Sequence, residues 1–206
     1  MTGVDRLDSL LRIILPLYLI AYLGVAFVWR SYVVWRRIGS NPVIFGGSDS
    51  LHDFLGRVFK VAVGLLALAI FVFALSPPLY QSLAPIVWLE HWGLKAVGLL
   101  LLLVSFASTA VAQAQMGASW RIGIDRNRRT AFVRHGLFRW SRNPIFLGMM
   151  VTLLGVFLVI PNALTLAIML VGLVATQAQV RLEEEHLTKV HGEAYLAYCR
   201  EVRRWL

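Results

Sequence analysis

Long apolar runs separated by short polar segments are the dominant pattern along this chain. A helix needs about 20 mostly apolar residues to cross a hydrocarbon layer of about 30 Å, and several runs approach that length. We therefore predict an all-α integral membrane protein that forms one membrane domain over residues 1–206. About five transmembrane helices are expected, and the runs that predict them cover residues 11–29, 61–75, 94–112, 144–160 and 163–179.

Turn-forming residues mark where several of these helices begin and end. Ser50 with Asp53 three residues later is typical of a capping box that opens a helix, and Ser76 followed by two prolines ends that helix. The last two runs are separated only by Pro161 and Asn162. So short a connection joins antiparallel helices, which predicts a tight helical hairpin for the last two spans, followed by a cytoplasmic C-terminal helix.

The composition is that of a protein dissolved in the bilayer. Of 206 residues, 58% are hydrophobic and 15% are charged, and the mean hydropathy is +0.69, which is too apolar for an ordinary soluble domain. No small-residue cleavage pattern follows the first run, so we expect a retained span rather than a signal peptide. The single cysteine, Cys199, excludes an intrachain disulfide, and the histidine spacing predicts no metal site.

Basic residues flank the apolar runs. The formal net charge is +9, but this distribution argues against a nucleic-acid partner and for orientation in a membrane. Because cytoplasmic loops carry the excess of Lys and Arg, we expect a protein of the bacterial inner membrane with its N-terminus outside and its C-terminus in the cytoplasm. The residues behind this orientation are Arg30, Arg36, Arg37, Arg57 and Lys60, then Arg121, Arg126, Arg128, Arg129, Arg134, Arg139 and Arg142, and finally Arg181, Lys189, Arg200, Arg203 and Arg204.

Candidate chemistry is concentrated in two polar segments on either side of the predicted hairpin, residues 132–148 and 181–198. Two antiparallel spans of similar length return the chain to the same membrane face, so the segment Arg142, Asn143 and Pro144 should lie close to the acidic triplet Glu183, Glu184 and Glu185. Arginines, an amide and carboxylates would then surround one interfacial pocket, where a polar ligand can meet a lipid-soluble one. Taken singly, these residues also fit helix starts and solvated helix faces, so the functional interpretation depends on their combination.

The two segments resemble the isoprenylcysteine carboxyl methyltransferase family, within the wider group of membrane methyltransferases that includes phospholipid methyltransferases. The resemblance covers about residues 115–206. Asn143 stands where the family commonly has His, and Phe146 where it commonly has Tyr; an amide does not titrate near neutral pH. The residues that carry the resemblance are Gly136, Phe138, Ser141, Arg142, Asn143, Pro144, Phe146 and Gly148, then Glu183, Glu184, Leu187, Gly192, Tyr195 and Tyr198.

The resemblance implies an enzyme that uses S-adenosylmethionine to methylate a lipophilic or amphiphilic acceptor, either a lipid or another small molecule. Residues 1–114 would supply N-terminal transmembrane helices, and residues 115–206 the cofactor-binding and catalytic region. Glutamates would pair with the positive groups of the cofactor, and arginines would bind a carboxylate. The implied catalytic residues are Arg142, Arg181, Glu183 and Glu184, and the implied cofactor-binding residues are Arg134, His135, Gly136, Leu137, Phe138, Ser141, Asn143, Pro144, Phe146, Glu184, Tyr195 and Tyr198.

Two other functions fit parts of the same pattern. Membrane sterol and steroid reductases have a similar C-terminal hairpin and bind NADPH, and the arginine-rich loop would suit a 2′-phosphate, although the paired glutamates would repel it. A non-enzymatic transport or assembly protein would carry charged residues well inside its spans, and none occurs within residues 61–75, 97–112, 145–160 or 163–179. The sequence does not choose between a carboxylate, a thiolate and an amine as the methyl acceptor.

Overall fold

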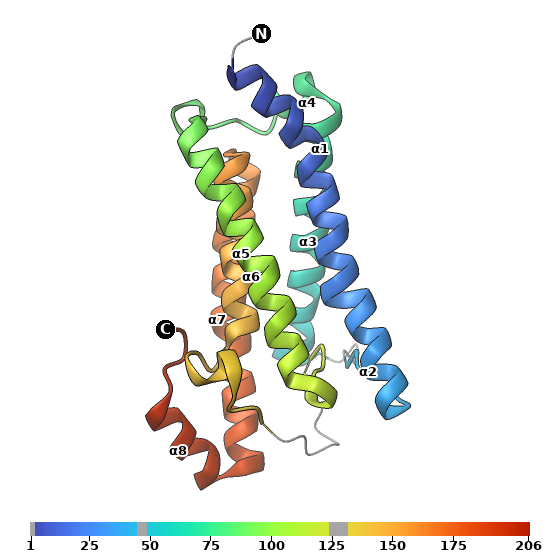
Figure 1. The fold of residues 1–206 in the computed structure, drawn as a ribbon, viewed down its shortest axis with the longest axis vertical. Helices are drawn as coiled ribbons and strands as arrows, with labels where there is room; N and C mark the ends of the chain where they lie inside the picture. The colour runs from blue at the N-terminus through green and yellow to red at the C-terminus, as the bar shows by residue number, and fades with distance from the viewer. Residues whose placement is uncertain (1–2, 45–48, 124–131) are drawn as a thin grey trace.

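The chain folds into a bundle of helices, and its computed structural model describes residues 3–44, 49–123 and 132–206. No β-strand occurs in those ranges. Figure 1 shows the long helices running in roughly the same direction, with the C-terminal helix at one end of the bundle. The predicted all-α class is therefore confirmed.

The first helical run is continuous but not uniform. It consists of α1 (Gly3–Leu23), a π-helical segment η1 (Gly24–Trp29) and α2 (Arg30–Ile38), so it contains the predicted first span and extends beyond it at both ends. It ends at Gly39, which has a left-handed φ of 67°, a conformation that glycine adopts without steric cost. The π-helical segment, which the sequence did not predict, lies beside the cavity described below.

The second long helix begins and ends where the sequence predicts. α3 (Leu51–Leu75) is capped by Ser50, whose hydroxyl accepts a hydrogen bond from the backbone N–H of Asp53 at 3.3 Å. At Ser76 the backbone becomes extended. Two short helices, α4 (Pro77–Gln81) and η2 (Val87–Leu89), then lead to the third long helix.

The second half of the chain contains the predicted hairpin. Its turn is fixed by a capping box in which the Thr165 N–H donates to Asn162 Oδ1 at 2.9 Å, and the Asn162 N–H donates to Thr165 Oγ1 at 3.2 Å. The last long helix continues well past the predicted end of the fifth span. The elements of this half are α5 (Trp92–Met116), η3 (Gly117–Ser119), η4 (Gly136–Arg139), α6 (Pro144–Val159), α7 (Ala163–His191) and α8 (Glu193–Glu201).

The expectation of five spans is confirmed in part. By length and composition, four helical runs of the described chain can cross a membrane, and they cover Leu7–Ile38, Leu51–Leu75, Trp92–Ser119 and Ala163–His191. The fifth, α6, is apolar but has only 16 residues. At 1.5 Å per residue it is about 24 Å long, which is shorter than the hydrocarbon layer.

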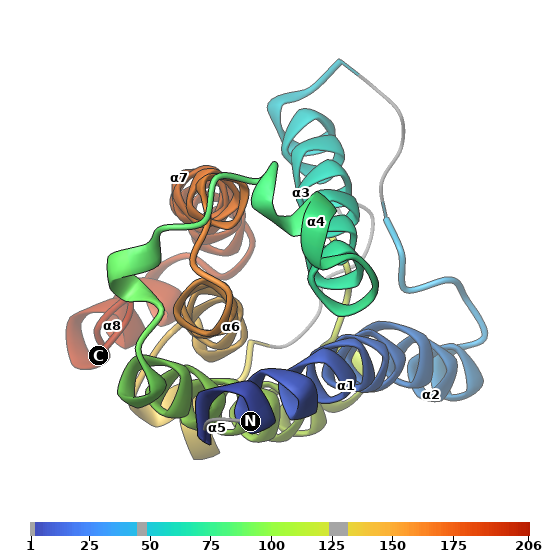
Figure 2. The same ribbon diagram turned by 90° about the horizontal axis from the view of Figure 1, so that it is seen from above.

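The helices form two groups with a cavity between them. Seen from above, α5, α6 and α7 lie together while α1 and α3 lie on the other side (Figure 2). Helix α3 contacts both α1 and α7, and α1 contacts α5, which joins the groups. The α5–α6 contact is close because it is made through glycines: a Cβ added to Gly98 would lie 2.8 Å from the carbonyl oxygen of Gly155.

An ion pair ties α1 to α5 near their N-terminal ends, far from α8. Lys95 Nζ lies 2.5 Å from Asp8 Oδ1, and the lysine side chain is only 4% exposed. This pair explains why a lysine is tolerated in the buried first turn of α5. It is a structural contact, since α8 and the motif segments lie at the opposite end of the bundle (Figure 1).

Candidate active site

The hairpin brings the two motif segments into direct contact. Glu184 on α7 accepts hydrogen bonds on Oε1 from Arg142 Nε at 3.1 Å and from Asn143 Nδ2 at 3.2 Å. The Arg142 and Glu184 side chains are only 10% and 11% exposed. The predicted proximity of these residues is therefore confirmed.

A third segment, the C-terminal residues 202–206, completes this contact. Arg204 donates to the other carboxylate oxygen of Glu184, from Nε at 3.0 Å and from Nη2 at 2.7 Å. The Arg204 carbonyl accepts hydrogen bonds from Ser141 Oγ at 3.3 Å and from Asn143 Nδ2 at 3.2 Å. We refer to Arg142, Asn143, Glu184 and Arg204 as the Glu184 clamp.

All three nitrogens of the Arg142 guanidinium group contact oxygen atoms of the protein itself. Besides its two contacts with Glu184, its Nη1 donates to the carbonyls of Val202 at 2.6 Å and Cys199 at 3.1 Å. Its backbone N–H donates to the Arg203 carbonyl at 3.0 Å. Arg142 therefore holds the loop before α6 against the C-terminus. Sequence reasoning used Arg203 and Arg204 only for membrane orientation, and no motif signalled these contacts.

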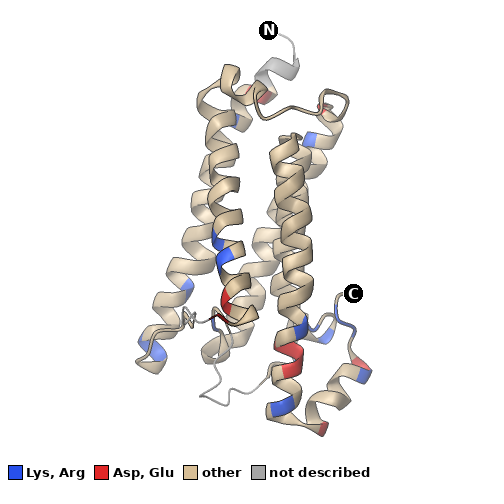
Figure 3. Cartoon of the chain, turned by 180° about the vertical axis from the view of Figure 1, so that it is seen from behind, with Lys and Arg blue, Asp and Glu red and all other residues tan. Residues whose placement is uncertain are grey.

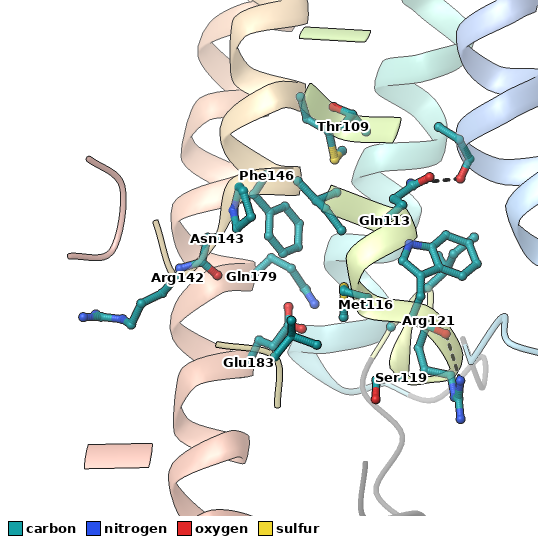
Figure 4. A pocket seen from close by; sticks show the side chains of 18 of the residues that line it. Thr109, Gln113, Met116, Ser119, Arg121, Arg142, Asn143, Phe146, Gln179 and Glu183 are labelled. Carbon is teal, nitrogen blue, oxygen red and sulfur yellow. Dashed lines mark hydrogen bonds between the residues drawn. The ribbon is translucent and has the colours of Figure 1, made fainter. Parts of the chain in front are cut away.

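A cavity of about 510 Å³ lies beside the clamp. Residues of α1, η1, α3, α5, α6, α7, α8 and the connecting loops line it, and Figure 4 shows their side chains converging from several helices. A narrower cavity of about 70 Å³ shares Tyr22, Phe27, Phe59 and Met149 with it and continues between the helices toward Ile70. The larger cavity contains the polar lining residues, among them Arg142, Glu183 and His186, and we call that part the polar mouth. The smaller cavity is lined mostly by apolar side chains, and we call it the apolar slot.

Glu183 borders this cavity (Figure 4). Its neighbour Glu184 lies in the clamp. Glu183 makes no hydrogen bond or ion pair with any residue that the structure describes. Arg181 lies outside the cavity on an exposed face of α7 and bonds Gln177, at 2.7 Å to its carbonyl and 3.0 Å to its Oε1. Among the four implied catalytic residues, Glu183 and Arg142 thus border the cavity and the other two do not.

The loop before α6 is shaped by backbone contacts as well as by the clamp. Gly136 has a φ of 61°, and the following N–H, that of Leu137, donates to Gln115 Oε1 at 2.8 Å. The Phe138 carbonyl accepts a hydrogen bond from Tyr198 Oη at 2.6 Å, which attaches α8 to the loop. These contacts connect α5, the motif loop and α8, so the loop is positioned by three separate elements.

Aromatic side chains form one wall of the cavity. The ring of Phe132 lies 4.9 Å from His191, 5.4 Å from Tyr195 and 5.6 Å from Tyr198, measured between ring centroids. Burial raises the pKa of Tyr198 to about 12, and burial also raises the pKa of Tyr195. Both phenols therefore stay protonated near neutral pH and can donate hydrogen bonds. The hydrogen bonds that Arg204 donates to Glu184 raise the pKa of Arg204, which keeps that guanidinium charged.

The implied cofactor-binding residues divide into two groups. Arg134 and His135 are exposed, and Arg134 forms an ion pair with Glu201 at 2.7 Å, outside the cavity. Asp125, Arg126, Arg128 and Arg129, which the arginine-rich loop also contains, lie outside the described residues. Those that line the cavity are Phe138, Asn143, Pro144, Phe146, Tyr195 and Tyr198, while Arg134, His135, Gly136, Leu137, Ser141 and Glu184 do not.

Comparison with known proteins gives this arrangement a family. The model of the phospholipid methyltransferase family matches residues 94–194. Two curated proteins from Oryza sativa, of subspecies indica and japonica, are each named a probable protein-S-isoprenylcysteine O-methyltransferase; each is 27% identical over 173 residues, which cover 80% of this chain and 91% of the relative. These matches support a membrane methyltransferase of the isoprenylcysteine carboxyl and phospholipid methyltransferase type.

A solved structure supports the fold of this methyltransferase. The eukaryotic intramembrane Ras methyltransferase, an isoprenylcysteine carboxyl methyltransferase, matches with a TM-score of 0.52 and 19% sequence identity. The match covers 89% of this chain and 73% of the other. At that identity the comparison shows a shared fold, which includes the N-terminal helices that the sequence resemblance covered weakly.

The cavity of the methyltransferase contains polar residues that sequence reasoning did not select. Gln113 and Gln179 lie within apolar helices, and His186 and His191 lie on the extension of α7. The two histidines belong to a motif segment and could have been chosen on that basis. The two glutamines are harder to recognise from the sequence. The only sign of a ligand site there is that a polar amide interrupts a long apolar helix.

Proposed function

We propose that this methyltransferase uses S-adenosylmethionine and transfers its methyl group to a lipophilic or amphiphilic acceptor at the membrane interface. The observation that carries the proposal is the pairing of two adjoining cavities with shared lining residues: Glu183, which has no partner in the described chain, borders the larger one, and the smaller one is an apolar slot within the bundle. A water-soluble cofactor and a lipid-soluble acceptor can meet in such a space.

The residues at the mouth fit S-adenosylmethionine. When bound, this cofactor supplies a methyl group on a positively charged sulfur, and it also carries an ammonium group. Glu183 offers a carboxyl group that has no hydrogen bond or ion pair with any described residue, and a cation beside it would favour its charged form, so it can pair with either of these cations. The Phe132, Tyr195 and Tyr198 wall can pack against a flat heteroaromatic ring.

The clamp changes the roles that the family resemblance implied. Arg142 was expected to bind a carboxylate of the cofactor or the acceptor, but its donors are used by Glu184 and by backbone carbonyls. Arg181 lies outside the cavity. We therefore assign cofactor contact to Glu183 and the aromatic wall, and positioning of the loop to Arg142 and Glu184.

The chain's own contribution to the reaction is chiefly placement. Methyl transfer is a displacement in line with the bond that breaks, and holding the nucleophile about 3–3.5 Å from the methyl carbon supplies much of the rate enhancement. The apolar slot would fix the hydrocarbon part of the acceptor and exclude water around it. For an amine acceptor, Glu183 borders the cavity and can take up the proton. A carboxylate acceptor needs no such step.

We also propose that the cavity mouth faces the cytoplasm of a bacterial inner membrane, with the N-terminus outside. The basic residues that flank the described helices support this orientation, because most of them lie at the α8 end of the bundle (Figure 3). Under this orientation, a soluble cofactor reaches the mouth from the cytoplasm and the acceptor reaches the slot from the membrane.

Cofactor binding tests the proposal directly. Isothermal titration of the detergent-purified protein with S-adenosylhomocysteine should show saturable binding, and titration with NADPH should show none. Glu183→Gln should weaken the first interaction. Binding of NADPH alone would overturn the proposal in favour of a membrane reductase, and binding of neither ligand would leave the cavity without the cofactor role assigned to it.

A further inference from the structure

Two amide side chains on membrane-spanning helices line the main cavity. Gln113 lies on α5 and Gln179 on α7, and the two residues are only 4% and 5% exposed. Figure 4 shows the Gln179 side chain reaching into the cavity, about one turn of α7 away from Glu183. Neither glutamine belongs to the motif segments that carry the family resemblance.

Both amides have hydrogen-bonding capacity that the described protein does not use. Gln113 Nε2 donates to the Ala26 carbonyl at 3.0 Å. A carbonyl oxygen can only accept, so this bond fixes the orientation of the amide and leaves Gln113 Oε1 as an acceptor without a partner in the described chain. Gln179 Nε2 lies 3.4 Å from His52 Nδ1, and its buried Oε1 has no hydrogen-bond partner.

Unpaired buried polar groups are destabilising, and native proteins contain few of them. Gln179 Oε1 is such a buried group, and Gln113 Oε1 is a second unpaired acceptor in the lining of the same cavity. Together the two amides point to a ligand group that completes their hydrogen bonds. Nearby polar side chains do not complete them: the hydroxyls of Tyr22 and Thr109 lie 3.4 Å from each other. Arg121 borders the cavity, but its Nη1 donates to the carbonyls of Ala118 and Trp120.

The position of the amides identifies which part of a ligand they would meet. Gln179 precedes Glu183 by four residues, which is one turn of α7, or about 6 Å further into the bundle. Beyond that level the lining becomes apolar, with Phe59, Val63 and Met149 shared by the cavity and the slot. The amides thus lie where the polar mouth ends and the apolar slot begins.

We propose that Gln113 and Gln179 form a subsite for an N–H or O–H donor in the linker of the methyl acceptor, between its polar head and its hydrocarbon chain. This inference rests on the proposed function, because it takes the occupant of the slot to be the acceptor. Gln113 Oε1 can only accept, so the matching ligand group donates. Amphiphiles with an amide or hydroxyl linker would be selected over ester-linked analogues of the same length.

A pair of probes that differ in one group tests the subsite. N-dodecanoylglycine has an amide N–H between its carboxylate and its chain, and dodecanoyloxyacetic acid has an ester oxygen in that place. Affinities are measured by isothermal titration in lipid nanodiscs that contain the protein saturated with S-adenosylhomocysteine. One hydrogen bond changes a binding constant by about fivefold, so the wild-type protein should prefer the amide by that factor or more.

Substitutions at the two glutamines test whether these residues cause the preference for the amide probe. Gln113→Met and Gln179→Met keep the side-chain length and remove the amide, so each should bring the amide-to-ester affinity ratio close to one. Gln177→Met is the matched control, because Gln177 lies on the same helix but bonds Arg181 outside the cavity. It should leave the ratio unchanged, which separates loss of the subsite from general damage to α7.

Three results would overturn the subsite: equal affinity of the wild-type protein for the two probes, binding of neither probe, or a preference that survives in both cavity variants. Saturation with S-adenosylhomocysteine is measured first in the same preparation. If the cofactor analogue binds and the preference is absent, the subsite alone is wrong. If the analogue does not bind, the proposed function fails, and the subsite fails with it.

Discussion

Three consecutive glutamates on α7 have three different surroundings. Glu183 borders the cavity, Glu184 is held by Arg142 and Arg204, and Glu185 forms a surface ion pair with Lys189 at 2.5 Å. Successive residues on a helix point in directions that differ by roughly 100°, which produces this separation. The sequence shows an acidic triplet, but it does not show which carboxylate faces the cavity, since that depends on how α7 is rotated against α3 and α6.

Replacing Glu183 with Gln should abolish most of the activity without harming the fold. The amide has the same shape but lacks the charge that we assign to cofactor binding, and removing one such electrostatic contact costs about a hundredfold in turnover. Thermal unfolding should not change, because Glu183 makes no polar contact with the described protein. Incorporation of labelled methyl groups into membranes measures the effect. Wild-type incorporation would show that the charge of Glu183 is not needed.

Replacing Glu184 with Gln should act through stability instead. Arg142 would keep its charge at a site only 10% exposed, and a buried ion pair that loses one partner costs about 3 kcal/mol. The C-terminal residues 202–206 would also lose their attachment to α7. We expect a lower unfolding temperature in detergent together with a loss of cofactor binding. Glu185→Gln, one residue away and exposed, should change neither; a Glu184 variant as stable as this control would contradict the clamp.

Local sequence signals predicted the ends of helices better than their interiors. Ser50, Pro161 and Asn162 act through contacts within a few residues, so their roles could be read from the sequence. The π-helical segment η1 could not, because the carbonyl of Ala26 is satisfied by Gln113 from a distant helix. The continuation of α7 to His191 was hidden by the change from apolar to charged residues, which ends a span but need not end a helix.

Glycines set the contact between α5 and α6, so enlarging one should separate these helices. A Cβ added to Gly155 would lie 2.9 Å from Leu102 Cδ2 and 3.1 Å from the Gly98 carbonyl. Gly155→Val should therefore destabilise the protein by about 1–3 kcal/mol, the usual cost of overpacking a filled core. The loop before α6 would shift with the helix, so cofactor binding should weaken as well.

A matched control for this substitution lies on α3. Gly64 has no atom within 4 Å of an added Cβ, and it faces away from the other helices. Gly64→Val inserts the same side chain into another membrane-spanning helix and should leave the unfolding temperature unchanged. Equal effects of the two substitutions would show that the cost arises within a helix and not at the α5–α6 contact.

At the scale of the whole molecule, the cavity is built from both halves of the chain. The sequence assigned cofactor binding and catalysis to residues 115–206, a division that stays a prediction. Yet Tyr22, Phe27, Phe59 and Val63, from α1, η1 and α3, line both the cavity and the slot. Hydrophobic patterns reveal that these segments span the membrane, but an almost uniformly apolar helix gives little indication of which face meets a ligand. That the first two spans line the cavity therefore became visible only in the three-dimensional structure.

The orientation of the molecule in the membrane follows from where its charges lie. Figure 3 shows most Lys and Arg positions toward the end of the bundle that holds α8 and the C-terminus. Lys95, in the first turn of α5 at the other end, is paired with Asp8. A short cytoplasmic loop tolerates unpaired Lys and Arg far better than a translocated one. The α8 end, with the cavity mouth, should therefore face the cytoplasm.

Labelling of single cysteines tests this orientation in intact cells. In a Cys199→Ser background, a cysteine at Leu206 should react with a membrane-impermeant maleimide only after the inner membrane is opened. A cysteine at Gln81, the exposed last residue of α4 at the opposite end, should react from outside. Reaction of position 206 from outside would invert the topology. The cavity mouth would then face a compartment without the cytoplasmic cofactor pool, so this result would contradict the placement of S-adenosylmethionine as well as the orientation.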